Sequence, residues 1–105
     1  MRAFRVDAPA QLDLLAATVW YEEQRDGLGD EFVGAVEAVF WRIRDTEEFV
    51  TAPVLKMPAA VIRRERTARF PYAVYFVEDD AGRCVIAVQH VRRDPNTWQA
   101  RARVR

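Results

Sequence analysis

The stretch from Arg69 to Trp98 constrains the fold more than any other part of the sequence. It contains two apolar runs of strand length, Tyr72 to Val77 and Cys84 to Val88, both rich in β-branched and aromatic residues. The residues between them, Asp79-Asp80-Ala81-Gly82, tolerate the backbone angles of a hairpin turn. Neither run alternates apolar with polar residues, so both strands should be buried on both faces. We therefore expect an antiparallel pair of strands at the centre of a sheet.

The composition is that of a small globular protein. Its 105 residues are enough for a single domain, residues 1–105, and half of them are apolar, which excludes intrinsic disorder. No apolar run approaches the roughly 20 residues of a membrane span, and the N-terminal residues lack the apolar segment of a secretory signal. Cys84 is the single cysteine and lies within an apolar run, so we expect a buried structural thiol. We expect a cytoplasmic protein with no metal and no cofactor.

The N-terminal part should form a short strand and a helix. Residues Arg2 to Val6 alternate in the manner of a strand, and Asp7 stands before Pro9 as the N-cap of a helix that ends near Gln24. Gly27 supplies the glycine that commonly follows a helix C-terminus. The apolar stripe of this helix should face the core, and it consists of Leu12, Leu15, Ala16, Val19 and Trp20.

A second helix should follow at once, with Asp30 as its N-cap and an end near Glu47. Because the link between the helices is short, they should form an antiparallel hairpin. The apolar stripe of the second helix consists of Phe32, Val36, Val39, Phe40 and Ile43.

The residues after the hairpin should form a loop and then a polar strand. Residues 49–60 contain two prolines and are expected to be a loop. Val61 to Thr67 should be an edge strand, because one of its charged faces must be solvated and charges block edge pairing. After Pro95 we expect a short helical or frayed tail. Strand alternation divides the charged residues of the edge strand between two faces, with Arg64 and Arg66 on one and Arg63 and Glu65 on the other.

The order of elements is therefore strand, helix, helix, strand, strand, strand. This order predicts an α+β fold in which the helical hairpin packs on one face of a mainly antiparallel four-stranded sheet. The other face of the sheet is either free for a partner or partly covered by the tail. The core between sheet and hairpin should consist of Val74, Phe76, Val85, Val88, Val36 and Phe40.

The charge is unevenly distributed along the chain. Residues 1–62 carry six basic and eleven acidic side chains, and residues 63–105 carry ten basic and five acidic ones, so the formal net charge is zero. Apart from Lys56, every basic residue is an arginine, whose guanidinium group suits phosphates and carboxylates. The basic half therefore either forms ion pairs with the acidic half or presents a surface to an anionic partner.

Three segments carry a resemblance to a known family. They are WYEEQRDGLGDEF (20–32) across the helical hairpin, RFPYAVY (69–75), and VQHVRRDPNTW (88–98). Together with the order of elements, they resemble the RelE/ParE superfamily of toxins from bacterial type II toxin–antitoxin systems, in particular its ParE-like, or plasmid-stabilisation, subgroup. The resemblance covers nearly the whole chain. It implies a small cytoplasmic growth inhibitor that is neutralised by an antitoxin in a hetero-oligomeric complex.

The superfamily contains DNA gyrase poisons, which are ParE-like, and ribosome-dependent mRNA endonucleases, which are RelE-like. The subgroup resemblance favours the gyrase poison. The endonucleases cleave at a 2′-hydroxyl, which requires a proton-transfer group and cations. They carry an arginine where this chain has Tyr72, and a terminal catalytic tyrosine near the place of Trp98. The residues that would be catalytic, only if this protein is a nuclease, are His90, Arg63, Arg69 and Arg93.

Two plainer readings stay open. His90 could be a strand-end residue bonded to a backbone carbonyl, and the whole chain could be a non-toxic homologue that only binds an antitoxin. In either toxin reading, the hairpin aromatics and the arginine-rich strand suit an acidic, amphipathic antitoxin segment that lies along them as a helix or a strand. The residues expected to bind a partner are Tyr21, Trp41, Arg63, Arg64, Arg66, Arg92, Arg93 and Trp98.

Overall fold

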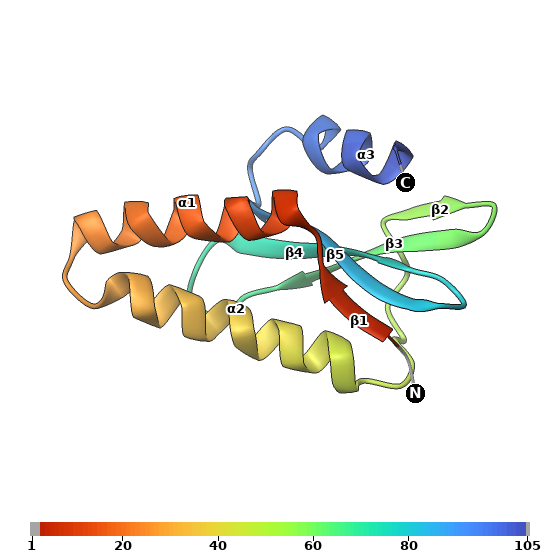
Figure 1. Ribbon diagram of the computed structural model, residues 1–105, viewed down its shortest axis with the longest axis horizontal. Coiled ribbons are helices and arrows are strands. Elements are labelled where there is room, and N and C mark those ends of the chain that lie inside the picture. Colours follow the sequence, from red (N-terminus) through yellow and green to blue (C-terminus); the bar gives the residue numbers. More distant parts are fainter. Residues whose placement is uncertain (1–2, 105) are drawn as a thin grey trace.

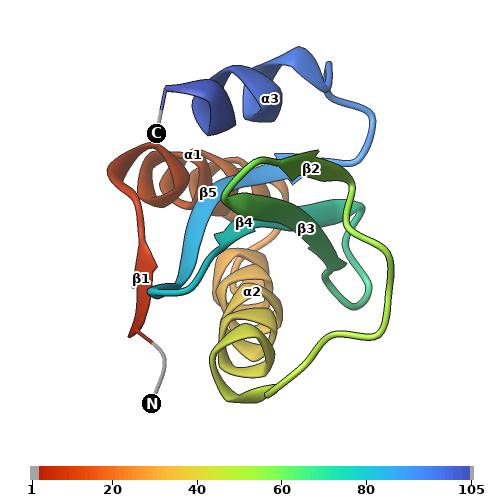
Figure 2. The ribbon, with the colours of Figure 1, turned by 90° about the vertical axis from the view of Figure 1, so that its right-hand side faces the viewer.

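The computed structural model describes residues 3–104 and has the predicted α+β architecture (Figures 1 and 2). Two helices, α1 and α2, form an antiparallel hairpin against a sheet, and the short C-terminal helix α3 lies on the side of α1 away from α2. No described helix is long and apolar enough to cross a membrane. The elements are β1 (Ala3–Val6), α1 (Ala8–Gln24), α2 (Leu28–Asp45), β2 (Leu55–Met57), β3 (Ala60–Arg66), β4 (Tyr72–Glu78), β5 (Gly82–His90) and α3 (Asn96–Arg103).

The sheet has five strands in the order β1-β5-β4-β3-β2. The expected central pair, β4 and β5, lies in the middle, and β1 pairs with β5 in the only parallel arrangement of the described sheet. One strand, β2, was not expected, because residues 49–60 were predicted to be a loop. Its three residues are flanked by Pro53 and Pro58, and they become a strand only through pairing with β3.

The strand β3 is a sheet edge along only half of its length. β2 pairs with Ala60 to Ile62, whereas the segment Arg63–Arg66 has no strand partner on that side among the described residues. The prediction of an edge strand is therefore right for the arginine-rich half and wrong for the apolar half. The consequence is an open backbone edge beside the charged side chains.

The core on the hairpin side is close to the predicted one. Val36, Val74 and Phe76 are buried there, together with the predicted β5 valines. Phe40, however, is only partly buried, and the large fully buried ring of α2 is that of Phe32. The predicted centre of the core is thus displaced by two turns along α2.

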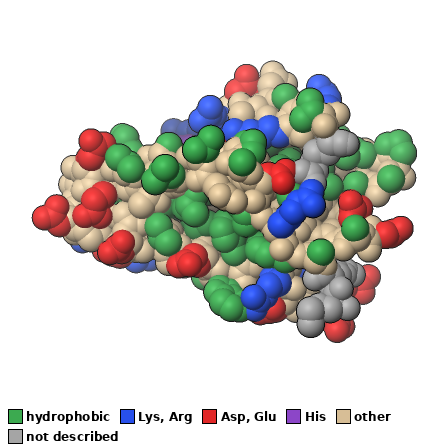
Figure 3. Space-filling model, in the orientation of Figure 1, with side chains coloured by type: hydrophobic (Ala, Val, Ile, Leu, Met, Phe, Trp, Pro, Cys, Tyr) green, Lys and Arg blue, Asp and Glu red, His purple; other side chains and the backbone are tan. Residues whose placement is uncertain are grey.

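The orientation of α1 corrects the sequence analysis. The predicted core stripe faces solvent, and Trp20 is 55% exposed. Instead, Ala10 and Ala17 are buried against the sheet, and Tyr21 lies in an aromatic cluster with Phe32. Small side chains let the helix axis approach the sheet closely, so the larger side chains are left on the outer side. Apolar side chains accordingly lie along the exposed side of α1 in Figure 3.

The link between the helices is tighter than expected. Gly27 has a left-handed backbone (φ 86°) and is itself the N-cap of α2, so Asp30 lies inside the helix rather than before it. The cap is supplied by α1: the carboxylate of Glu22 accepts hydrogen bonds from the backbone N–H groups of Gly27 (2.9 Å) and Gly29 (3.0 Å). A Cβ on Gly29 would lie 2.9 Å from the carbonyl oxygen of Thr18, so the helices meet at a glycine.

The second face of the sheet is covered by α3. The ring of Trp98 stacks on Tyr75 at a centroid distance of 4.8 Å, and Ala102 completes a second buried cluster. Arg101 fastens this helix, because its guanidinium group donates to Asp13 of α1 (2.6 and 3.1 Å) and to the carbonyl of Ile86 (2.9 Å). The expected tail is therefore an ordered helix bound to both α1 and β5.

Candidate partner-binding surface

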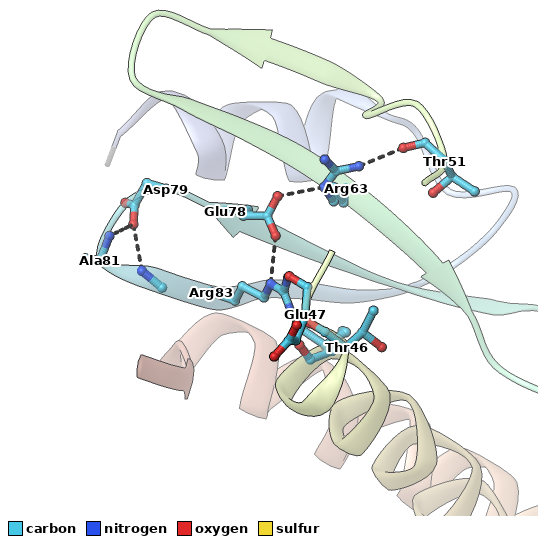
Figure 4. A network of polar contacts seen from close by, with 10 residues as sticks. Thr46, Glu47, Thr51, Arg63, Glu78, Asp79, Ala81 and Arg83 are labelled. Carbon is cyan, nitrogen blue, oxygen red and sulfur yellow. Dashed lines mark hydrogen bonds and ion pairs between the residues drawn. The ribbon is translucent and has the colours of Figure 1, made fainter. Parts of the chain in front are cut away.

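One group of arginines belongs to the fold, and Figure 4 shows how it is bound. Arg83 is 3% exposed, and its guanidinium group donates to Glu78 (2.7 Å) and to carbonyl oxygens at the end of α2, those of Ile43 (2.6 Å) and Glu47 (2.8 Å) among them. Arg63 donates to the other oxygen of the Glu78 carboxylate (2.9 Å) and to the carbonyl of Thr51 (2.7 Å). A residue predicted to be catalytic and partner-binding, Arg63, is thus held inside a structural network.

The electrostatics of this network centre on Glu78. Burial raises the pKa of its carboxyl group, but the hydrogen bonds from Arg63 and Arg83 outweigh burial and lower the pKa below its ordinary value. The carboxylate therefore stays charged between two cations. Because Arg83 also binds the last carbonyls of α2, this network closes the C-terminal end of the helix.

Arg69 lies at the opposite end of the hairpin. It adopts a left-handed backbone (φ 71°) in the turn before β4, and its guanidinium group donates to Glu31 at 2.7 Å. The hydrogen bonds from Arg69 and Arg25 lower the pKa of Glu31. All of these groups are exposed at the surface, so the pairs contribute little to stability.

His90 ends β5, directly opposite Tyr72 of β4, and the two rings are in contact at 5.6 Å between centroids. Its Nδ1 atom accepts a hydrogen bond from the backbone N–H of Arg92 (3.0 Å). His90 therefore binds a backbone donor, whereas the simpler interpretation from the sequence expected it to bind a backbone carbonyl. Burial raises the pKa of Tyr72, and the positive charge of Arg93 opposes that shift. His90, Tyr72 and Arg93 therefore share one end of the sheet.

The four residues of the predicted nuclease set do not form one group. Arg63 pairs with Phe76, four residues along β4 from the Tyr72–His90 pair, which is about 13 Å at about 3.3 Å per residue. Arg69 is bound to the hairpin at Glu31. Only His90 and Arg93 remain near each other, at the end of β5.

Two exposed arginines lie on the α3 side of the sheet. Arg64 stands beside Tyr75, and Arg66 stands beside Ala73, each as a cross-strand neighbour. Among residues 3–104, no acidic side chain is bonded to either guanidinium group. The prediction that one charged face of β3 is solvated is confirmed for Arg64 and Arg66. Arg63 and Glu65 lie on the hairpin side, where they are bound to Glu78 and Arg42, respectively.

We call Arg64, Arg66 and the backbone segment Arg63–Arg66, which has no strand partner on its outer side among the described residues, the arginine edge; within it, the carbonyl of Arg66 accepts a hydrogen bond from Arg42 at 3.3 Å. An extended segment of a partner can add to an open strand edge through backbone hydrogen bonds, while the two guanidinium groups bind its carboxylates. Arg92 and Arg93 are also exposed, in the turn after β5. The arrangement thus suits an extended acidic peptide.

The next residue in the cross-strand row of Arg66 and Ala73 is Gln89. Gln89 is 3% exposed, and neither polar atom of its side chain has a hydrogen-bond partner among the described residues. A buried amide without partners costs free energy, on the order of 1–3 kcal/mol. No pattern in the sequence indicates that Gln89 is buried, because a glutamine at the end of a strand is normally solvated.

The aromatic residues expected to bind a partner have three different environments. Trp41 is exposed on α2, with the guanidinium group of Arg44 stacked 3.8 Å from its ring centre. Tyr21 is packed against Phe32, and Trp98 belongs to α3 and is buried between this helix and the sheet. Only Trp41 therefore offers an open ring. Among residues 3–104, no group of three or more His, Cys, Asp or Glu side chains is placed to hold a metal ion.

Comparisons with known proteins find a likeness in fold. No protein-family model matches the sequence, and no curated protein matches it either. Among solved structures, a chain of the "Chromosomal ParDE TA system from P. aeruginosa" superimposes with a TM-score of 0.60 and 14% sequence identity. The match covers 86% of this chain and 96% of that chain. At this identity the likeness shows a shared fold, and it agrees with the resemblance found in the sequence.

Proposed function

We propose that this protein is the toxin component of a type II toxin–antitoxin system and acts as a ParE-like poison of DNA gyrase. The observation that supports the proposal most is the shared fold with a chain of a ParDE system over nearly the full length of both chains. The three sequence motifs support the same family. The protein would then be a cytoplasmic growth inhibitor held in a complex with its antitoxin.

The antitoxin would bind the arginine edge. Arg64 and Arg66 are exposed beside the open backbone of β3, so an acidic segment of the antitoxin can extend the sheet and bind both guanidinium groups. Arg92 and Arg93 add positive charge at the end of β5. Co-expression with the product of the neighbouring gene should yield a tight complex, and a monomer that is stable, harmless and unaffected by that product would contradict this part of the proposal.

The dispersed nuclease set supports a mechanism without proton transfer. The alternative, a ribosome-dependent mRNA endonuclease, is favoured by one observation, the grouping of His90 with Tyr72 and Arg93 at the end of β5. In that mechanism His90 would transfer the proton, because an imidazole ring can both accept and donate one.

A substitution of His90 separates the two mechanisms. His90→Asn keeps an acceptor for the N–H of Arg92 but cannot transfer a proton at neutral pH, whereas His90→Ala also removes the acceptor. We expect both variants to stop growth after induction as the natural protein does. Loss of a general acid or base would instead reduce mRNA cleavage by about 10²–10⁴-fold and restore growth.

Purified components give the direct measurement. We expect the protein to inhibit supercoiling by DNA gyrase and to leave ribosome-bound mRNA intact. A soluble, folded His90→Asn protein that no longer harms cells, together with mRNA cleavage by the natural protein, would establish the nuclease instead.

A further inference from the structure

The outer face of α1 is apolar and uncovered. Leu12, Leu15, Val19 and Trp20 are 66%, 59%, 51% and 55% exposed, and they follow one another at the spacing of a single helix face. Figure 3 shows apolar side chains along the outer side of α1. A helix on the surface of a soluble protein normally carries polar residues on its outer side. We call these four residues, with the exposed Ala8 and Ala16, the α1 strip. A contiguous apolar patch of this kind marks an interaction site.

We propose that the α1 strip binds a second copy of this chain, so that two α1 helices pack antiparallel around a two-fold axis near Leu15 and Ala16. A C₂ interface uses the same patch on both copies, so the patch must be complementary to itself. The site lies outside the arginine edge and does not depend on the proposed function.

The order of side chains along the strip meets this requirement. Reversing the helix about a point between Leu15 and Ala16 places Leu12 of one copy against Val19 of the other. The same operation places Leu15 of each copy against Ala16, and the small alanine lets the two helices approach closely at the crossing. Two half-exposed apolar surfaces would thereby cover each other.

The charges select the antiparallel direction. The exposed charged residues of α1, Glu22 and Glu23, both lie at its C-terminal end, and Glu23 continues the strip while the carboxylate of Glu22 is bound to the N–H groups of Gly27 and Gly29. In a parallel pair the two Glu23 carboxylates would face each other, whereas in the antiparallel pair each lies near the N-terminus of the other α1 helix, beside Ala8. A carboxylate is stabilised at a helix N-terminus by the helix dipole.

The N-terminus of α1 also lacks a side-chain cap. Asp7 occupies the N-cap position but makes no hydrogen bond to the N–H groups of the helix. Its carboxylate instead accepts from the thiol of Cys84 at 3.1 Å and pairs with Arg5 at 3.6 Å. The first turn of α1 can therefore interact with a carboxylate from the second copy.

The size of the contact sets its strength. From Ala8 to Glu23 the helix is about 22 Å long at about 1.5 Å per residue. One face of a helix of this length buries less area than a standard interface, which buries about 800 Å² on each partner. We therefore expect a reversible dimer with a Kd of about 1–100 µM. Because Arg64 and Arg66 point to the other face of the sheet, the dimer leaves the arginine edge open.

Sedimentation velocity of the purified full chain tests the proposal. We expect a concentration-dependent dimer, and Leu15→Glu should raise its Kd by about 100-fold or more, because two carboxylates would meet beside the axis. Trp41→Glu is the matched control: this ring is equally exposed at 55% but lies on the outer side of α2, and its substitution should leave the Kd unchanged. Equal melting temperatures would show that both variants are folded.

Cross-linking tests the direction of the helices. Under mild oxidation, Ala16→Cys should give a covalent dimer, because the two positions meet at the axis, whereas Glu23→Cys should not, because its two copies lie at opposite ends. The natural Cys84 is buried and does not interfere. A natural protein that is monomeric at about 200 µM, a dimer insensitive to Leu15→Glu, or faster cross-linking through Glu23→Cys would each overturn the proposal.

Discussion

Arg63 and Arg83 differ sharply from Arg64 and Arg66 of the arginine edge, although all four lie on the same sheet. The guanidinium groups of Arg63 and Arg83 share the carboxylate of Glu78 and donate to backbone carbonyls, so both are bound within the molecule. Arg64 and Arg66 lie on the same strand as Arg63 but point to the other face, where no carboxylate of the described part of the chain is bonded to them. The same residue type thus stabilises the fold at one position and is available for a partner one residue further along.

The difference shows that the number of arginines alone does not predict whether a protein surface binds an anionic partner. What decides the role of each is the alternation of strand side chains and the place where the C-terminus of α2 meets the sheet. This comparison can be tested by removing each kind of arginine and its partner.

Removal of Arg83 should have the largest effect. Arg83→Met fills the space but leaves one carboxylate oxygen of Glu78 and the carbonyl of Ile43 without their donor, while Arg63 still binds the other oxygen of Glu78. We expect the free energy of unfolding to fall by about 3–5 kcal/mol, measured by urea denaturation. Arg92→Met, at an exposed position, is the control and should change stability by less than about 0.5 kcal/mol. Similar losses in both variants would remove the distinction between the two kinds of arginine.

Removal of the charge on Glu78 should have a smaller, pH-dependent effect. Because the pKa of Glu78 is lowered in the folded protein, its ionisation stabilises the fold above its unfolded pKa, and this contribution is lost as the pH falls through the folded pKa. Glu78→Gln should cost about 2 kcal/mol at neutral pH. The difference from the natural protein should shrink in acid, below the ordinary glutamate pKa of 4.5.

Denaturation curves between neutral and acid pH give this measurement. Glu48→Gln, at an exposed position after the end of α2, is the control and should not alter the pH profile. A constant difference between Glu78→Gln and the natural protein at all pH values would show that the carboxylate charge plays no part.

Removal of the exposed pair should have the smallest effect on folding. Arg64→Ala combined with Arg66→Ala should change the free energy of unfolding by less than about 0.5 kcal/mol, since no internal partner is lost. If the antitoxin binds the arginine edge, its affinity, measured by calorimetry with the co-expressed product, should fall by about tenfold or more. Arg103→Ala, exposed on α3, is the control for a general loss of positive charge. An unaltered affinity in the double variant would place the antitoxin elsewhere.

Much of the fold could be predicted from local patterns. The runs of β4 and β5 are apolar on both faces, which identifies central strands, and the alternation along β3 correctly separated Arg64 and Arg66 from Arg63 and Glu65. The orientation of α1 could not be predicted, because the helix is apolar on all sides and the larger side chains outnumber the two alanines that lie against the sheet. The face of α1 that packs inward is the one that lets the helix axis come closest to the sheet.

The environment of the arginines depended on contacts between distant residues. Local sequence does not reveal that Glu78 lies between Arg63 and Arg83, or that Arg83 reaches the carbonyls at the end of α2. For the same reason Glu22 was not recognised as the cap of α2, and Gln89 was not recognised as a buried amide. The residue types were visible in the sequence, whereas their partners are set by the tertiary structure.

The parallel pairing of β1 with β5 has a consequence for the way the chain folds. Ala3 lies beside Gly82 so closely that a Cβ on that glycine would be 2.2 Å from the carbonyl oxygen of Ala3. Among the described strands, β1 therefore pairs only with β5, the last of them in the sequence, and at about 5–20 residues per second several seconds separate the synthesis of the two. Such non-local pairing slows folding. The complete sheet, and any activity that depends on it, can assemble only after β5 has been synthesised.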